Sequence, residues 1–184
     1  MTNTPPDLLT PRLRLRPFTL EDAAAVQTLA GNPAIAAMTL NIPHPYPDGA
    51  AAQWISTHAD NWQQGQSLTY AITRREDDVL MGCISLGFHA RHEMAEMGYW
   101  LGQPYWNQGY ATEAAQALIH YGFTDLKLNR IYAYHLPRNP ASGRVMQKNG
   151  MTYEGLLRQA AKKGDTFEDL ILYAILREDH LPES

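Results

Sequence analysis

The sequence is poor in the features that mark secreted, membrane-spanning and nucleic-acid-binding proteins. It contains one cysteine, Cys83, so an intramolecular disulfide framework is excluded, and the apolar run around it predicts a buried, unreactive thiol. The longest apolar run, residues 170–176, is far too short to span a bilayer, and the N-terminus lacks the apolar core of a signal peptide. The 15 basic residues are scattered among 19 acidic ones and form no stripe that would neutralise nucleic-acid phosphates. We expect a cytoplasmic protein without nucleic-acid or membrane partners.

A single compact domain is expected from 184 residues of which 45% are hydrophobic. Leucine and arginine alternate over residues 12–16, which is typical of a strand with one wet face. A helix over residues 23–30 follows and is expected to stop at the Gly-Asn-Pro of residues 31–33. After the prolines of residues 43–47, Asp48 is expected to cap a second helix. The N-terminal third therefore predicts one strand and two helices.

The rest of the chain predicts a mixed sheet with two further helices. Expected strands cover residues 68–73, 79–88, 95–101 and 130–136 and two segments within 151–177, and expected helices cover 111–126 and 140–150. This order predicts a mixed α/β fold, with about seven strands in a mostly antiparallel, twisted sheet and about four flanking helices.

The segment AEMGYWLGQPYWNQGYATEA, residues 95–114, predicts a strand, a short loop with Gly109 and the start of a helix. Backbone N–H groups at a helix N-terminus have no intrahelical partner and attract anions, so residues 107–112 form a candidate phosphate cradle. The signal is weak by itself, because many such turns hold nothing. A nucleotide-binding Rossmann domain is disfavoured, since GxGxxG is absent and the expected strands are largely joined as hairpins.

A second segment, RNPASGRVMQKNGMTYEG at residues 138–155, follows at the spacing of the next strand–helix unit. Together with TPRLRLRPFTLEDA, IPHPYP and DLILYAILRED elsewhere, these motifs resemble the RimJ/RimL-like branch, the ribosomal-protein N-terminal acetyltransferases, of the GNAT superfamily. The resemblance covers nearly the whole chain and implies one GNAT N-acetyltransferase domain over residues 8–180. It also implies a sheet that splays between its fourth and fifth strands.

The resemblance implies that acetyl-CoA is the co-substrate and lies where strand 95–101 splays from strand 130–136. Backbone groups of Trp100 and Leu101 are the candidates for binding the pantetheine arm. Trp106 stands where the superfamily often has Arg or Gln, so phosphate binding is expected to depend on main-chain donors. The candidate pyrophosphate-binding residues are Gln108, Gly109, Tyr110, Ala111 and Thr112.

Asn139 and Ser142 match the NPAS motif of this branch. The resemblance implies that the Asn139 amide contacts the cofactor and that the Ser142 hydroxyl lies near the thioester sulfur, where it would be both cofactor-binding and catalytic. Asn is also a favoured helix N-cap before proline, and Ser142 can belong to the same cap, so a purely structural role stays open for both.

The expected reaction is direct attack of an amine on the thioester, which requires a proton acceptor, an oxyanion donor and help for the leaving thiolate. Glu96 is the first candidate base, with Glu93 and His92 as rivals, although each also fits an exposed loop charge. A main-chain N–H of strand 95–101 would hold the oxyanion. Ala160 and Ala161 occupy the stretch where ribosomal relatives have an implicated glutamate, which leaves the proton route of those relatives in doubt here. His89 and His92 have HxxH spacing without further ligands, so no metal is expected.

The acceptor side is the least defined by sequence. His44, Tyr46, Trp54 and Glu93 are candidate substrate-binding residues, with Trp62 as a further aromatic suspect, although aromatic residues at helical spacing are more often core. The expected acceptor is a protein or peptide N-terminal α-amine. A small amine such as an antibiotic, polyamine or amino acid is the first alternative, and a non-catalytic acyl-CoA-binding regulatory domain is the second. A homodimer through the C-terminal strands is left open.

Overall fold

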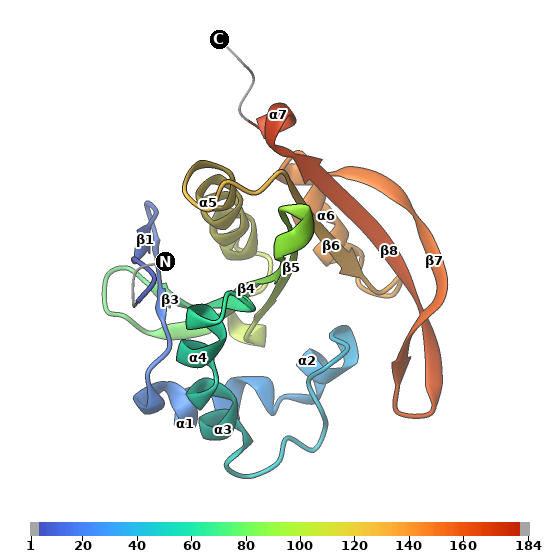
Figure 1. Cartoon of the computed structure of the whole chain (residues 1–184). Coiled ribbons are helices and arrows are strands. Elements are labelled where there is room, and N and C mark those ends of the chain that lie inside the picture. Colours follow the sequence, from blue (N-terminus) through green and yellow to red (C-terminus); the bar gives the residue numbers. More distant parts are fainter. Residues whose placement is uncertain (1–3, 181–184) are drawn as a thin grey trace.

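The computed structural model describes residues 4–180, which form an eight-stranded sheet with flanking helices (Figure 1). The strand order is β1-β2-β3-β4-β5-β6-β8-β7, and all neighbours are antiparallel except β5 and β6, which are parallel. The mixed α/β fold class predicted from the sequence is confirmed. The strands are β1 (Leu8–Leu9), β2 (Leu13–Pro17), β3 (Ser67–Arg74), β4 (Leu80–His89), β5 (Met94–Leu101), β6 (Arg130–His135), β7 (Thr152–Lys163) and β8 (Thr166–Leu176).

Helices cover both faces of the sheet. One face buries the apolar side of α5 and α6 in the main core, and α1 and α3 pack a smaller cluster, with Val26 and Ile55, against the other face. Because side chains alternate along a strand, Ala95 and Met97 of β5 point into the main core while Trp100 packs in the smaller cluster. The α-helices within residues 4–180 are α1 (Ala23–Ala30), α2 (Pro33–Met38), α3 (Ala50–Ser56), α4 (His58–Gln63), α5 (Tyr110–Thr124), α6 (Pro140–Lys148) and α7 (Arg177–His180).

The feature that positions the site is the separation of β5 from β6. The two strands pair only at Met94 with Arg130, Ala95 with Ile131 and Glu96 with Tyr132. Beyond Glu96, β5 continues to pair with β4 as far as Leu101, while β6 pairs with β8 on its other side. The predicted splay is therefore present, and it leaves one edge of β5 free of strand pairing within the described residues.

Strand β1 and helices α2 and α7 were not predicted. β1 is two residues long, too short to produce a readable alternation. Helix α2 begins where the sequence predicts only the end of α1: the Asn32 side chain accepts a hydrogen bond from the Ala34 N–H at 2.9 Å, and Pro33 occupies the first helical position. The residues that stop one helix therefore start the next.

The predicted cap of the following helix was wrong. Gly49, with φ of 76°, occupies the N-cap of α3 instead of Asp48, and this left-handed conformation favours glycine. The single helix expected to carry Trp54 and Trp62 is divided at Thr57 into α3 and α4.

Cys83 is 4% exposed, and burial raises the pKa of its thiol well above the ordinary value, as expected for an unreactive cysteine. Among residues 4–180, no helix has the length and apolar character needed to cross a membrane.

Candidate active site

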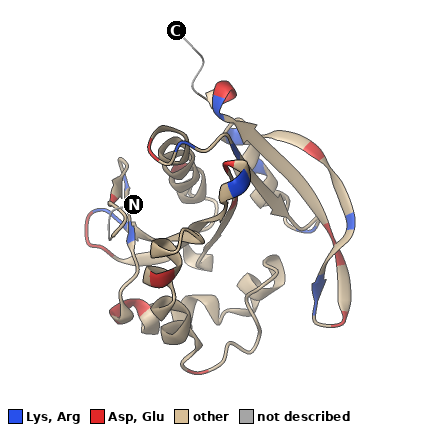
Figure 2. Cartoon of the chain, in the orientation of Figure 1, with Lys and Arg blue, Asp and Glu red and all other residues tan. Residues whose placement is uncertain are grey.

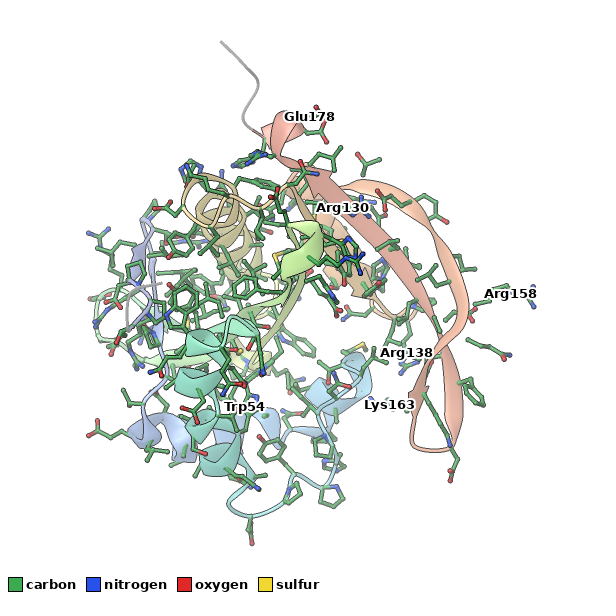
Figure 3. The ribbon with its side chains drawn as sticks, in the orientation of Figure 1. Trp54, Arg130, Arg138, Arg158, Lys163 and Glu178 are labelled. Carbon is green, nitrogen blue, oxygen red and sulfur yellow. The ribbon has the colours of Figure 1, made fainter. Side chains whose placement is uncertain are left out.

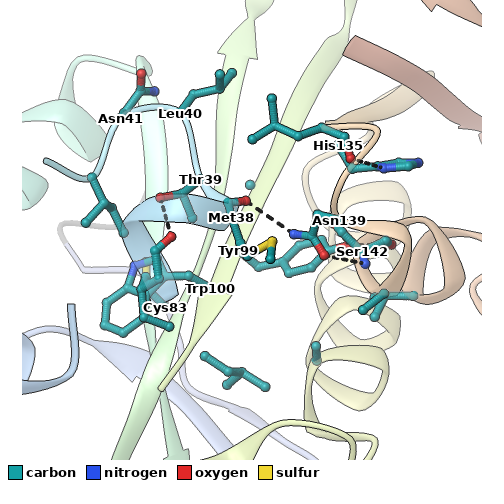
Figure 4. Close-up of a pocket in the computed structure, with 18 of the residues that line it drawn as sticks. Met38, Thr39, Leu40, Asn41, Cys83, Tyr99, Trp100, His135, Asn139 and Ser142 are labelled. Atoms are coloured by element: carbon teal, nitrogen blue, oxygen red, sulfur yellow. Dashed lines mark hydrogen bonds between the residues drawn. The ribbon is translucent and has the colours of Figure 1, made fainter. Parts of the chain in front are cut away.

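A cleft of about 950 Å³ lies where β5 and β6 separate (Figure 4). Its floor is formed by β4 and β5, and one wall is formed by α1, α2, α3 and the 39–47 loop. The other wall is formed by the end of β6, the N-terminal part of α5 and one side of α6. Eleven of the predicted site residues line this cleft, although they come from separate parts of the sequence. They are Tyr46, Trp54, Glu96, Trp100, Leu101, Gly109, Tyr110, Ala111, Thr112, Asn139 and Ser142.

The loop before α5 takes the shape of an anion cradle. Asn107 and Gly109 have φ of 59° and 82°, so two left-handed residues turn the chain sharply into the helix. The first intrahelical bond is donated by the Glu113 N–H to the Gly109 carbonyl at 3.0 Å. The N–H groups of residues 110–112 therefore stand at the positive end of a 15-residue helix without intrahelical acceptors.

Arg12 supports this loop from behind, which the sequence did not reveal. Its guanidinium donates to the Gln108 carbonyl at 3.0 Å and to the Glu113 carboxylate at 2.7 Å, and it lies 4.5 Å from the centre of the Tyr110 ring. The first-turn carboxylate is thus neutralised on the far side of the helix. Gln108 itself is exposed and does not line the cleft.

Trp106 ties the loop to the end of β5. Its indole N–H donates to the Leu101 carbonyl at 2.7 Å, so a large side chain stands where a phosphate-binding cation would be expected in other GNAT sequences. One lone pair of this carbonyl is therefore already engaged.

The N-terminus of α6 forms the opposite side of the gap. Asn139 caps the helix by accepting the Ser142 N–H at 3.3 Å, and its amide donates to the Met38 carbonyl at 3.2 Å (Figure 4). Gly143 faces the ring of His135, where an added Cβ would lie 2.7 Å from Nε2, so the helix sits close to β6. The capping role considered for Asn139 is present.

Tyr99 is the polar partner of Ser142. The Tyr99 hydroxyl lies 2.8 Å from Ser142 Oγ and donates to the Ser142 carbonyl at 2.9 Å. Since that carbonyl only accepts, the arrangement leaves Ser142 Oγ as the donor to the tyrosine oxygen. Burial raises the pKa of Tyr99, against the opposing effect of the Ser142 bond, which keeps the phenol protonated. Sequence reasoning missed Tyr99, which appears only as one of two aromatic residues in the strand motif.

Glu96 lies at the point where the strands separate, beside Gly87 on β4 and Tyr132 on β6. Its side chain is exposed to the cleft, but the surrounding walls still remove part of its hydration, and this raises the pKa of the carboxyl. The nearby positive charge of His89 acts in the opposite direction. Glu96 in turn contributes to the raised pKa of Tyr132 and Tyr134, for which burial is the larger cause.

The two rivals of Glu96 lie outside the cleft. His92 and Glu93 are exposed in the turn before β5, and the Glu93 carbonyl accepts the Asn129 N–H at 2.6 Å. His89, the other half of the HxxH pattern, forms a 2.8 Å hydrogen bond to the Tyr132 hydroxyl through Nε2. Within residues 4–180, no three metal-ligating side chains come together.

The predicted acceptor residues divide into two groups. Tyr46 and Trp54 line the cleft, and the Trp54 ring packs edge-on against His58 at 4.4 Å and Phe18 at 5.2 Å. His44 is exposed and Trp62 is 3% exposed within the main core, and neither lines the cleft.

A bridge of hydrogen bonds joins the two walls across the gap. Lys163 donates from Nζ to the carbonyls of Ala36 and Thr39 at the end of α2, and Arg138 donates to the Ala37 carbonyl at 3.0 Å. Figure 3 shows Arg138 and Lys163 between α2 and the β7–β8 hairpin. Two cations thus satisfy carbonyls at the negative end of a short helix, a contact made possible by the long hairpin.

Comparison with known proteins identifies the family of the chain. The profile of the acetyltransferase (GNAT) domain matches residues 12–152. The uncharacterized N-acetyltransferase YnaD of Bacillus subtilis (strain 168) is 32% identical over 94% of this chain and 98% of its own length. The ribosomal-protein-serine acetyltransferase of Escherichia coli (strain K12) is 35% identical over 61% of this chain and 62% of its own length.

A solved structure of the same family has a similar fold. Mycobacterium smegmatis RimJ in complex with CoA-disulfide superposes with a TM-score of 0.86 at 26% identity, covering 99% of this chain and 92% of that chain. The chain belongs to the GNAT family of N-acetyltransferases, and its relatives include ribosomal-protein acetyltransferases of the RimJ/RimL type.

Proposed function

We propose that the protein transfers the acetyl group of acetyl-CoA directly to a primary amine, and that the acceptor is the N-terminal α-amine of a protein or peptide. The observation that carries this proposal is the cleft itself, in which a free edge of β5 runs between an anion cradle at α5 and a hydroxyl pair at α6. The cradle suits the pyrophosphate of acetyl-CoA, the free strand edge suits the amides of its pantetheine arm, and the hydroxyl pair suits its thioester.

The residues of the donor arm fit acetyl-CoA. The N–H groups of residues 110–112 would hold the pyrophosphate, and the edge of β5 near Trp100 and Leu101 would bind the amides of the pantetheine arm. Arg144 and Lys148 lie one turn apart on α6, are exposed and line the same cleft, so they supply positive charge that the loop itself lacks. Asn139, engaged at both ends of its amide, positions Ser142 by capping α6.

The transfer forms a bond between the amine nitrogen and the acetyl carbon and breaks the bond to sulfur. The amine must lose a proton, and the departing thiolate must gain one. Glu96 accepts the amine proton, directly or through water, because its raised pKa makes the carboxylate more basic. When the thioester is bound, Ser142 Oγ turns its single proton from the Tyr99 oxygen to the sulfur. Tyr99, held protonated by burial, then donates to Ser142 Oγ and orients that hydroxyl. A main-chain N–H on β5 stabilises the negative charge on the carbonyl oxygen.

The preference for an N-terminal α-amine is supported by the relatives that acetylate ribosomal proteins, among them the ribosomal-protein-serine acetyltransferase of Escherichia coli. The second candidate is a small amine. It is favoured by one observation: Tyr46 and Trp54 make the acceptor wall aromatic, and aromatic pockets suit small ligands as well as peptide ends.

A free-thiol release assay with acetyl-CoA tests the proposal. The acceptors are short peptides that differ in their first residue and a panel of small amines, each run with the wild type, Ser142→Ala and Glu96→Gln. Release with peptides, sharply reduced in both variants, is expected. Thiol release only with a small amine would show that the acceptor is a small molecule and not a peptide. Tight acetyl-CoA binding without any turnover would contradict the proposed function.

A further inference from the structure

The acceptor wall of the cleft carries almost no charge. Residues 23–47 contain no aspartate, glutamate, lysine or arginine, and Asp48 is the single such residue between positions 48 and 59. Helices α1, α2 and α3 and the loop between α2 and α3 are accordingly almost entirely tan in Figure 2, whereas charges are spread over the rest of the fold. This wall therefore offers an acceptor almost no ionic partner.

The side chains of this wall that line the cleft are largely apolar. Met38 and Leu40 are half-buried and belong to neither of the two buried clusters, so their apolar surface is left facing the cleft (Figure 4). Apolar surface of this kind gains stability when a ligand removes it from water. Other apolar or aromatic lining residues on this side include Ile35, Ile42, Tyr46 and Trp54, and Cys83 and Trp100 lie on the floor.

Charge on the lining is confined to the donor side and to one carboxylate. Among the described residues that line the cleft, Glu96 is the single acid, while Arg138, Arg144 and Lys148 stand on the wall that carries α6. One carboxylate matches one ammonium. A second positive charge on the acceptor would lie against the uncharged wall without a partner or approach the basic residues, and both placements are unfavourable.

We propose that the acceptor arm selects a monoamine whose amino group is attached next to a large apolar group. This inference rests on the proposed function and narrows its substrate class. For a peptide acceptor it means an N-terminal Leu, Met or Phe in preference to Ser or Ala, and for small amines it means an arylalkylamine in preference to a polyamine. Glu96 binds the single ammonium, and Met38, Leu40 and the aromatic residues cover the apolar group.

The test compares kcat/KM for peptides identical except for their first residue, Phe, Leu, Met, Ala or Ser, with phenethylamine and spermidine alongside. The Phe, Leu and Met peptides are expected to exceed the Ser and Ala peptides by about tenfold or more, as is usual for apolar pockets. Leu40→Glu places a second carboxylate in the wall and is expected to lower the rate with the Phe peptide and raise the rate with spermidine. Leu20→Glu, at a leucine that is 62% exposed outside the cleft, is the matched control. It is expected to leave the rates with the Phe peptide and with spermidine unchanged.

The outcomes separate the two levels of proposal. Thiol release that is fastest with the Ser or Ala peptide, or with spermidine, overturns the apolar selectivity and leaves the acetyltransferase function standing. No release with any acceptor, despite acetyl-CoA binding, overturns the proposed function and the selectivity with it. Equal effects of Leu40→Glu and Leu20→Glu also overturn the assignment of this wall to the acceptor.

Discussion

Two hydroxyl groups from distant parts of the chain, those of Tyr99 and Ser142, meet in the lining of the cleft. Tyr99 comes from β5 and Ser142 from α6, 43 positions apart, and burial raises the pKa of the Tyr99 phenol, so it stays protonated. Ser142 could be found by its motif, but its partner could not, because the bond depends on how closely α6 approaches β5. We treat Tyr99 as a positioning residue that acts through Ser142.

Tyr99→Phe is expected to lower kcat by about tenfold, within the range for loss of one hydrogen bond that supports proton transfer, and to leave KM for acetyl-CoA nearly unchanged. Steady-state kinetics at saturating acceptor measure both constants. Tyr153→Phe, at a tyrosine that is 55% exposed, is the control. An increase in KM without a fall in kcat would show that Tyr99 serves cofactor binding instead.

The proposed role of Glu96 predicts how kcat depends on pH. The proposed mechanism needs the Glu96 carboxylate, and partial dehydration raises its pKa, so the acid limb of the kcat profile is expected above the ordinary 4.5. The positive charge of His89 lowers the Glu96 pKa, and therefore His89→Gln is expected to move this limb to higher pH. Profiles of kcat against pH for wild type, His89→Gln and the control His120→Gln measure the shift. A limb that moves to lower pH in His89→Gln would contradict the assignment of Glu96 as base.

At the scale of elements, the N-terminus of α5 depends on a left-handed backbone conformation at Gly109. Gly109→Ala adds a Cβ at φ of 82° and 3.4 Å from the Arg12 guanidinium, so it is expected to strain the cradle and raise KM for acetyl-CoA several-fold, at a cost of about 1 kcal/mol in stability. Gly49→Ala is a matched control, because Gly49 has φ of 76° at the N-cap of α3 and open space for a Cβ. Equal increases of KM in the two variants would argue against a phosphate cradle at Gly109.

The hydrogen bonds from Lys163 connect the β7–β8 hairpin to the end of α2. Lys163→Met removes the donor that holds two α2 carbonyls, and we expect faster hydrogen exchange in residues 33–47 with a reduced kcat/KM for the acceptor. Lys162→Met, at the exposed neighbouring lysine, serves as the control. Unchanged exchange in Lys163→Met would mean that packing and the hydrogen bonds from Arg138 and Asn139 hold α2 without Lys163.

Sequence patterns predicted most elements because their signals are local. The alternation in β2 and the apolar spacing of α5 are readable within one element. Helix α2 was missed because Asn32 and Pro33 serve equally as a stop and a start, and the bridge from Lys163 joins residues more than 120 positions apart. The turn at Gly109 could be anticipated from its motif, whereas Arg12, which supports the turn, lies 96 positions before Gln108 in the sequence.

At the scale of the whole molecule, a buried histidine couples folding to pH. Burial lowers the pKa of His58 to about 4, and its ring nitrogens have no hydrogen-bond partner among the described residues. Because the unfolded chain takes up this proton near pH 6.5 and the folded protein does not until about 4, stability is expected to fall as pH drops through this window.

His58→Phe is expected to flatten that dependence, by at most about 3 kcal/mol, from the ~1.4 kcal/mol that each pKa unit represents. Denaturant unfolding at several pH values between 4 and 7 measures the free energy of unfolding, with His120→Phe as the control. An unchanged slope in His58→Phe would show that His58 is not the group responsible.

The central claim is that the cleft passes an acetyl group directly from acetyl-CoA to an amine. The most direct measurement is mass spectrometry of a single turnover with acetyl-CoA labelled in the acetyl group, following the label on both the protein and an acceptor peptide. The account predicts label on the acceptor α-amine in step with the free CoA released, and none on the protein. Label retained on Ser142 or any other side chain, or CoA release without a labelled acceptor, would contradict it.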